Sequence, residues 1–322
     1  MKTQIELVHL QITKNCNLRC WFCGQWGKKG FFADDKGELL SLNKWLEIIN
    51  ELENYGKKVN KLPDVMLWGG EPLVSPYFTT ILKTLHQKGF KVGMVTNGVH
   101  INDYISLINE CVSVMYVSID GDKNTHDEIR GSGVFDKVIS NLKLVSNNVK
   151  IRVMSVITPK LLDNFTLFTN VLSTVNIDKL ILQEMIYLTP SEAENYKNRL
   201  NSAFNQNADY IESWVSNPPN LREKTYQLLK GNYNVNIEFL PHNVVSDRSC
   251  LSSYKHIHIA WNGNVLFCTD FYDFSAGNVL NDTVENIFNG SLAQKFRNEI
   301  SKCDLETCKH CSWKNSNAFY LD

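Results

Sequence analysis

Two hydrophobic patterns alternate through the first 187 positions. Short, nearly continuous apolar runs, typical of buried strands, lie at 7–13, 65–68, 91–96, 113–119, 150–157 and 179–185. Between them, apolar residues recur at helical spacing in segments 42–55, 78–85, 135–145 and 165–172. Six strands that each lead into a helix predict an α/β fold with a parallel sheet and right-handed crossovers. The pattern leaves open whether this sheet is flat or curled into a partial barrel.

The pattern changes after residue 187. Residues 190–231 are polar and helical in pattern, with interspersed aromatic side chains, and the Pro218-Pro219 pair interrupts them. Short strands at 256–261 and 265–267 flank Asn262-Gly263, which is a hairpin signature, and one helix is expected over 284–300. We therefore expect three parts: residues 1–187, a helical bridging segment 188–249, and a small hairpin-plus-helix domain 250–322.

Composition narrows the class of protein. The chain has 322 residues, 43% of them hydrophobic, which suits one catalytic domain with a smaller appendage. The net charge of −1 creates no field that favours nucleic acid or a membrane surface, so neither partner is expected. The N-terminus lacks the apolar run of a signal peptide, and no apolar run is long enough to span a bilayer. A cytoplasmic location is expected, where disulfides rarely persist.

The nine cysteines are unevenly distributed. Eight lie in two groups near the chain ends, which favours metal ligation, whereas Cys111 has apolar neighbours and is expected to be a buried small side chain. The first group, Cys16, Cys20 and Cys23, has the spacing C-x3-C-x2-C where the first strand ends. Three thiolates fill three corners of a [4Fe–4S] cluster and leave one iron open. The alternatives are unrelated thiols or a zinc site, for which His9 is the only nearby fourth ligand.

Later motifs extend this pattern. The second expected strand is followed by Trp68-Gly69-Gly70-Glu71-Pro72, and the third is followed by Thr96-Asn97-Gly98. The fourth ends in Ser118-Ile119-Asp120-Gly121, and His126-Asp127-Glu128-Ile129-Arg130-Gly131 comes shortly after it. With the cysteine triplet, these motifs resemble the radical S-adenosylmethionine (SAM) superfamily over about the first 160 residues. The resemblance implies a partial (β/α)6 barrel whose open iron binds SAM. An electron from the cluster then cleaves SAM to methionine and a 5′-deoxyadenosyl radical.

The same resemblance implies contacts with SAM. Phe22 would lie at the adenine, and Glu71 would accept a hydrogen bond from the amino group. Gly69 and Gly70 would let the backbone approach the ligand, and Asn97 would add a polar contact. Ser118 and Arg130 would hold the ribose and the carboxylate. A surface salt bridge is the alternative role for Arg130.

The C-terminal cysteines follow the order Cys250-x12-Gly263-x4-Cys268, then Cys303-x4-Cys308-x2-Cys311. This spacing resembles the SPASM and twitch extensions of radical SAM enzymes, which hold auxiliary [4Fe–4S] clusters. Five cysteines imply one auxiliary cluster, with Cys250, Cys268, Cys308 and Cys311 as ligands. Cys303 would be spare or would replace Cys308, and a zinc site with the same four cysteines is the alternative.

The expected reaction follows from the resemblance. The radical would abstract a hydrogen atom from a C–H bond of a peptide or small metabolite, followed by oxidation through the auxiliary cluster, either dehydrogenation or cross-linking. An epimerase with a cysteine hydrogen donor is the alternative, and a non-catalytic electron-transfer or zinc-structural protein is a more distant one. Asp270 is the candidate base and Glu184 the second candidate. A flavodoxin or ferredoxin would donate electrons.

The substrate is left open between a peptide and a small metabolite. The sequence shows no extra N-terminal domain of the kind that grips leader peptides. This favours a small metabolite or a short peptide over a long precursor.

Overall fold

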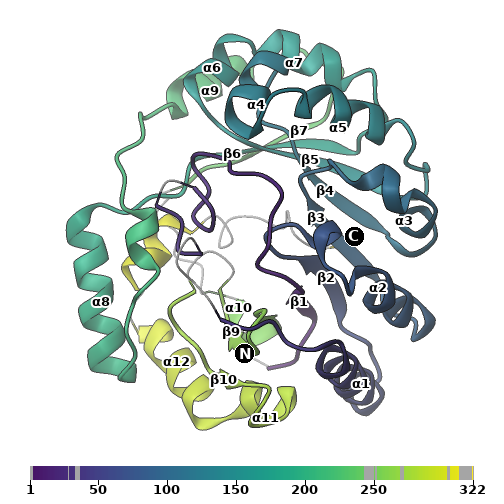
Figure 1. Cartoon of the computed structure of the whole chain (residues 1–322). Helices are drawn as coiled ribbons and strands as arrows, with labels where there is room; N and C mark the ends of the chain where they lie inside the picture. The colour runs from purple at the N-terminus through teal and green to yellow at the C-terminus, as the bar shows by residue number, and fades with distance from the viewer. Residues whose placement is uncertain are drawn as a thin grey trace.

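The computed structural model describes residues 3–27, 29–32, 37–242, 250, 252–268, 272–302, 305–311 and 321. Its strands form one curved sheet in the order β10-β9-β8-β1-β2-β3-β4-β5-β6-β7, and Figure 1 shows this sheet as an open, barrel-like arc with helices outside it. The strands are β1 (Leu7–Gln11), β2 (Asp64–Trp68), β3 (Val92–Thr96), β4 (Val114–Ser118), β5 (Lys150–Val156), β6 (Lys179–Gln183), β7 (Ile237–Leu240), β8 (His256–Ile259), β9 (Asn264–Leu266) and β10 (Gly277–Asn278).

Helices follow most of the parallel strands and cover the outside of the sheet (Figure 1). The α-helices are α1 (Leu42–Val59), α2 (Phe78–Gln87), α3 (Ile105–Cys111), α4 (Lys123–Arg130), α5 (Val134–Leu142), α6 (Pro159–Asp163), α7 (Phe165–Leu172), α8 (Pro190–Phe204), α9 (Arg222–Leu228), α10 (Ser252–Lys255), α11 (Val284–Asn289) and α12 (Ser291–Lys302). Short 3-10 helices are η1 (Pro72–Val74), η2 (Ile101–Tyr104), η3 (Ile211–Trp214) and η4 (Glu306–His310). Local signals define their ends. In α1, for example, the Ser41 side chain accepts a hydrogen bond from the Lys44 N–H, and Asn60 ends the helix in the left-handed conformation.

The predicted fold class is confirmed: β1 to β6 form a parallel sheet, and a C-terminal antiparallel hairpin follows. Three details differ from expectation. A seventh parallel strand, β7, pairs with β6. The hairpin strand β8 pairs in parallel with β1, so the hairpin continues the sheet. The expected helix over 284–300 is two helices, because Gly290 adopts an extended conformation between α11 and α12.

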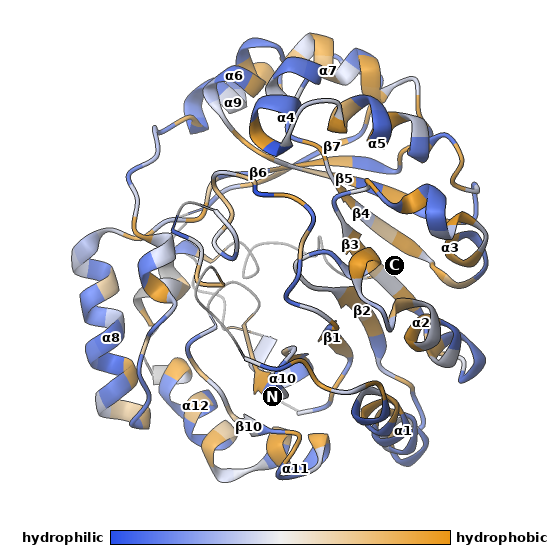
Figure 2. Cartoon of the chain, viewed as in Figure 1, coloured by the Kyte–Doolittle hydropathy of each residue, from blue (hydrophilic) through white to orange (hydrophobic). Residues whose placement is uncertain are grey.

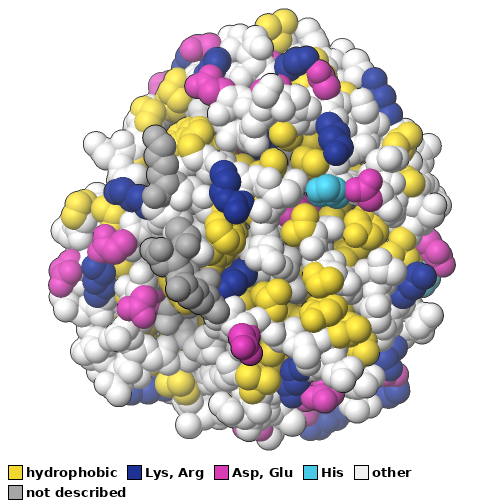
Figure 3. Space-filling model, viewed as in Figure 1, with side chains coloured by type: hydrophobic (Ala, Val, Ile, Leu, Met, Phe, Trp, Pro, Cys, Tyr) yellow, Lys and Arg dark blue, Asp and Glu magenta, His cyan; other side chains and the backbone are white. Residues whose placement is uncertain are grey.

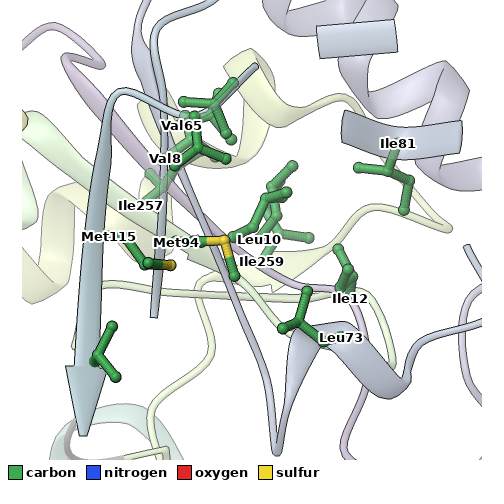
Figure 4. Packing of buried hydrophobic residues seen from close by; sticks show 14 of the residues in the cluster. Val8, Leu10, Ile12, Val65, Leu73, Ile81, Met94, Met115, Ile257 and Ile259 are labelled. Carbon is green, nitrogen blue, oxygen red and sulfur yellow. The ribbon is translucent and has the colours of Figure 1, made fainter. Parts of the chain in front are cut away.

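Two apolar layers stabilise the sheet. The outer layer, between sheet and helices, includes Val8 and Leu10 of β1 beside Ile257 and Ile259 of β8, as Figure 4 shows. Figure 2 shows that apolar residues concentrate on the strands and on parts of the surrounding helices. Inside the arc, a smaller cluster comprises Leu7, Met66, Val114, Tyr116, Ile181, Leu240 and Leu321.

The interior cluster determines which end of the barrel is available for chemistry. Leu7 and Val114 are the first residues of their strands, so the cluster lies towards the amino ends of β1 and β4. Leu321 packs there against Gly93, where a Cβ atom would lie 2.4 Å from the leucine side chain. The carboxyl ends of the strands, which carry functional sites in parallel α/β folds, remain for the site.

The molecular surface carries charges of both signs, interspersed on the face in Figure 3. Among the described helices, none is both long and apolar enough to cross a bilayer.

Candidate active site and metal centres

A cavity of about 310 Å³ lies at the carboxyl ends of the parallel strands. Every residue that the sequence predicts for the first cluster or for SAM lines this cavity: Cys16, Cys20, Phe22, Cys23, Gly69, Gly70, Glu71, Asn97, Ser118 and Arg130. They come from the loops after β1, β2 and β3 and from the ends of β4 and α4, so the fold brings them together. We call this space the cofactor cavity.

The cysteine loop follows β1 and directs polar hydrogens at its sulfur atoms. The Leu18 N–H lies 3.4 Å from the Cys16 Sγ, and the Trp26 N–H lies 3.4 Å from the Cys23 Sγ. Such donors stabilise thiolate charge in iron–sulfur sites. Burial raises the pKa of the Cys16 thiol to about 11, so a thiolate there needs a cationic partner such as an iron cluster.

The Gly69-Gly70 pair packs against the backbone of the cysteine loop. The Gly70 N–H donates to the Thr13 carbonyl at 3.0 Å, and a Cβ atom on Gly69 would lie 2.3 Å from that same oxygen. A Cβ atom on Gly70 would lie 2.3 Å from the Lys14 carbonyl oxygen. The sequence interpretation assigned these glycines to a close approach of the ligand. The close approach that the structure shows is between two loops, and no side chain fits at either position.

Glu71 is buried and joins two strand ends. Its carboxylate accepts hydrogen bonds from the Leu73 N–H at 3.1 Å, the Thr96 hydroxyl at 2.7 Å and the Asn97 N–H at 2.7 Å. Burial raises the pKa of Glu71, and the backbone and hydroxyl donors oppose this shift. The contact between Glu71 and the SAM amino group stays a prediction. The three donors within the protein already define the orientation of the Glu71 carboxylate.

Arg130 forms a buried ion pair in the cavity wall. Its Nε donates to the Asp120 carboxylate at 2.6 Å, and the other carboxylate oxygen accepts the Val156 N–H at 2.9 Å. The Arg130 side chain is 10% exposed and Asp120 is fully buried, so the alternative of a surface salt bridge is wrong. The motif around Ser118 includes Asp120, but the sequence does not predict its role as the partner of Arg130.

Cys250, Cys268, Cys308 and Cys311 line a second, mainly apolar space, here called the auxiliary cavity. No three of these sulfur atoms lie within 4.8 Å of one another. Thiolates around a tetrahedral zinc ion, with Zn–S about 2.3 Å, would be about 3.8 Å apart. Four thiols at wider spacing suit an iron–sulfur cluster, which is larger than one ion. Cys303 and Asp270 lie outside the described residues.

The last cysteine pair is anchored to α8. His310 lies between Cys308 and Cys311 in sequence, and its Nε2 is 2.8 Å from the Glu192 Oε1. The other oxygen of Glu192 accepts the Thr189 N–H at 2.8 Å and so caps α8. One carboxylate therefore joins the helix start to the loop with two predicted ligands.

Aromatic and imidazole rings separate the two cavities. Trp68 and Tyr272 line the cofactor cavity, and His258 lines the auxiliary cavity. The His258 ring centroid is 4.8 Å from that of Trp68 and 5.2 Å from that of Tyr272. His258 lies opposite His9 in the β1–β8 register, and burial lowers the pKa of His9 to about 3, which keeps it uncharged. Sequence reasoning missed His258, because His-Ile-His-Ile also fits a half-solvated hairpin.

Two carboxyl groups near the cavities bear on the choice of a base: Glu184, which is the second candidate from the sequence, and Asp273, which is not a sequence candidate. Glu184 is bound by the Arg222 guanidinium at 2.9 and 2.6 Å and by the His242 N–H, so its oxygens are occupied. Asp273, which was not predicted, accepts the Tyr210 N–H at 2.7 Å, while its Oδ2 has no hydrogen-bond partner among the residues that the structure describes. Burial raises the pKa of Asp273 to about 7.

Comparisons with known proteins agree with this arrangement. Residues 10–164 match the family described as the radical SAM superfamily, and residues 250–312 match SPASM, an iron–sulfur cluster-binding domain. GTP 3′,8-cyclase of Clostridium perfringens is 30% identical over 159 residues, 48% of this chain and 47% of the relative. Sporulation killing factor maturation protein SkfB of Bacillus subtilis is 30% identical over 140 residues, 42% of this chain and 32% of the relative. The chain thus spans half or less of the length of these curated relatives.

Among solved structures, SuiB of Streptococcus suis bound to SAM superposes with a TM-score of 0.67 at 16% identity, covering 96% of this chain and 72% of SuiB. At this identity the likeness concerns the fold alone.

Proposed function

The chain is a radical SAM enzyme that joins a radical SAM domain to a SPASM iron–sulfur domain, and on that premise we propose that it oxidises a peptide at one of its C–H bonds. Cys16, Cys20 and Cys23 would hold the first cluster, and Phe22, Gly69, Gly70, Glu71, Asn97, Ser118 and Arg130 would bind SAM beside it. When bound, the cluster supplies the electron that cleaves SAM to the 5′-deoxyadenosyl radical, the species that takes the hydrogen atom.

The protein residues would position and shield the reactants. Arg130, oriented by Asp120, would pair with the SAM carboxylate, because a guanidinium bound through Nε still has donors on its other nitrogens. Trp68, Trp214 and Tyr272 would exclude water from the cavity.

The observation that carries the oxidative half of the proposal is the shared wall between the two cavities. The four cysteines of the auxiliary cavity would hold a one-electron acceptor behind His258, Trp68 and Tyr272. Net oxidation of the substrate radical releases one electron and one proton, so an acceptor close to the substrate is required. A flavodoxin or ferredoxin would exchange electrons with the clusters.

The charges of the cofactor cavity favour a peptide over GTP, the substrate in the name of the first relative. Arg130 is the only cation among the described residues that line this cavity, and Asp120 neutralises it. A triphosphate needs several unbalanced cations or donors. SuiB binds a precursor peptide, SuiA, and SkfB is a maturation protein, which supports peptide modification on this fold.

The proposal is tested with anaerobically reconstituted enzyme, SAM and dithionite. We expect 5′-deoxyadenosine to form and a library of randomised, end-blocked peptides to yield members that lack two hydrogen atoms. Conversion of GTP under the same conditions, with no peptide modified, would contradict the proposal.

A further inference from the structure

We infer that a second cavity beside the cofactor cavity binds the peptide residue that flanks the reacting carbon, and that it selects an uncharged, apolar or aromatic residue. This space, here called the flanking cavity, measures about 200 Å³. The inference rests on the proposed function. It identifies the part of the fold that would determine which peptide sequences are modified.

The flanking cavity adjoins the cofactor cavity. Glu184 and Met185, directly after β6, line both spaces. The cofactor cavity takes its motif residues from the ends of β1 to β4, whereas the flanking cavity adds Thr158 after β5 and His242 after β7. A substrate whose reacting carbon lies near SAM can therefore extend along the strand ends into the second space. An extended chain fits this arrangement better than a compact metabolite.

Part of the wall is formed by an aromatic side chain and proline rings. Trp21 lines one side and is 46% exposed, although its neighbour Cys20 is buried. Pro159, Pro218 and Pro219 also line the cavity, and proline rings lose little conformational freedom on binding. An exposed tryptophan at the rim of a cavity is a common anchor for a peptide or protein partner.

The charges of the cavity select against ionic side chains. Arg222 and Glu184 form a bidentate ion pair in the wall, and no Lys is among the described lining residues. Arg222 uses its Nε and Nη2 for Glu184 and for the His242 carbonyl, and its Nη1 has no hydrogen-bond partner among the described residues. A neutralised guanidinium with an unused nitrogen, Nη1, suits a peptide carbonyl, whereas an anion would have to compete with Glu184.

The test uses the holoenzyme, SAM, dithionite and the library of randomised, end-blocked peptides. Modified members are sequenced by tandem mass spectrometry, and the readout is the enrichment of each residue type next to the modified residue. We expect the wild type to enrich apolar and aromatic residues about two- to tenfold over acidic ones, the size of one aromatic contact. Trp21→Ala should abolish most of this enrichment. Leu167→Ala, which removes a 59% exposed side chain on α7, should retain it.

Enrichment is a ratio, so a variant that is merely less active keeps the wild-type preference. If Trp21→Ala does not take up iron, Pro219→Ala replaces it, because Pro219 lies far from the cysteine loop in sequence and should also reduce the enrichment. A wild type that modifies peptides without preference, or variants that keep its preference, would overturn the inference and leave the proposed function intact. A wild type that forms 5′-deoxyadenosine but modifies no peptide would overturn both.

Discussion

Asp120 at the end of β4 shows how single residues of the motifs stabilise the site. One of its oxygens holds Arg130 and the other holds the backbone of Val156, the last residue of β5. Glu71, which follows β2, likewise joins two strand ends, because its carboxylate accepts hydrogen bonds from the Thr96 hydroxyl and the Asn97 N–H at the end of β3. Motif spacing predicted which residues gather in the cavity, because it reports recurrent chemistry at strand ends. It could not assign these bonds, because a hydrogen-bond partner depends on the distance between loops that are remote in sequence.

Replacing Asp120 by Asn should weaken both stability and SAM binding. The substitution keeps the volume but leaves the buried Arg130 without its counter-charge, which costs about 3–5 kcal/mol of unfolding free energy. SAM affinity, measured anaerobically by calorimetry, should fall at least about tenfold because Arg130 is no longer oriented. The matched control is Asp136→Asn. Asp136 also forms an ion pair, with Lys123, but this pair lies at the surface and the Asp136 side chain is 61% exposed. This substitution should cost less than about 1 kcal/mol, and equal effects of the two substitutions would refute the buried-pair argument.

Asp273 should make stability depend on pH. Burial raises its pKa in the folded state from 3.8 to about 7. Between these values the folded state binds more protons than the unfolded state, so stability falls as pH rises from about 4 to about 7. Asp273→Asn removes this contribution and keeps an oxygen for the Tyr210 N–H. The thermal midpoint of the variant minus that of the wild type should increase from pH 5 to pH 7.5, and a pH-independent difference would argue against the shifted pKa.

At the scale of elements, local pattern and long-range pairing differ in how well the sequence predicts them. The six strands β1 to β6 and helices such as α7 carry apolar runs of the correct period, and their positions were predicted within two residues. The parallel pairing of β8 with β1 was not predicted, since β8 is separated from β1 by most of the chain. The histidines of β8 line the auxiliary cavity. Alternating polar and apolar residues usually indicate a strand with one face in solvent, but here the polar residues of the alternation are buried.

The contact between the glycine loop and the cysteine loop can be tested with one methyl group. Gly70→Ala places a Cβ atom 2.3 Å from the Lys14 carbonyl and 2.4 Å from that of Asn15, so the cysteine loop must move. We expect iron at the first site to be lost or to become labile towards a chelator. The control is Gly133→Ala, where, apart from its neighbours in the chain, no described residue has an atom within 4 Å of the added Cβ, and the positive φ of +78° opposes the substitution. That strain costs about 1 kcal/mol and should leave the iron content unchanged. Normal iron content in Gly70→Ala would refute the packing argument.

At the scale of the whole molecule, the two predicted metal centres lie at opposite ends of the sequence but on one continuous sheet. β1 leads into the first cysteine loop, and its neighbour β8 lies in the hairpin that precedes Cys268. The division into 1–187, 188–249 and 250–322 stays a prediction. Because β8 and β9 extend the same sheet, we expect the hairpin and the barrel to unfold together rather than as independent units.

Iron content separates the two centres. Reconstituted protein should bind about eight irons, four for each [4Fe–4S] cluster. Replacing Cys16, Cys20 and Cys23 by Ala should leave about four irons and abolish SAM cleavage, because only the first cluster offers an open iron. Cys311→Ala should lower iron at the second centre, retain SAM cleavage and abolish the oxidised product, because the substrate radical then has no nearby electron acceptor.

The Cys311→Ala variant also tests the shared sheet. Four cysteines converge on the auxiliary cavity: Cys308 and Cys311 from η4 and its C-terminal end, and Cys250 and Cys268 from either side of the hairpin. A bound cluster therefore links these elements to one another and, through the β8–β1 pairing, to the barrel. Loss of the cluster should therefore lower the thermal midpoint of the whole chain in one transition, because binding to the folded state stabilises everything that unfolds with it. Cys111→Ser is the control, since this cysteine lies at the end of α3 and lines neither cavity. Two separate transitions in Cys311→Ala, with the barrel unfolding at its wild-type temperature, would show that the hairpin and the barrel are independent despite their common sheet.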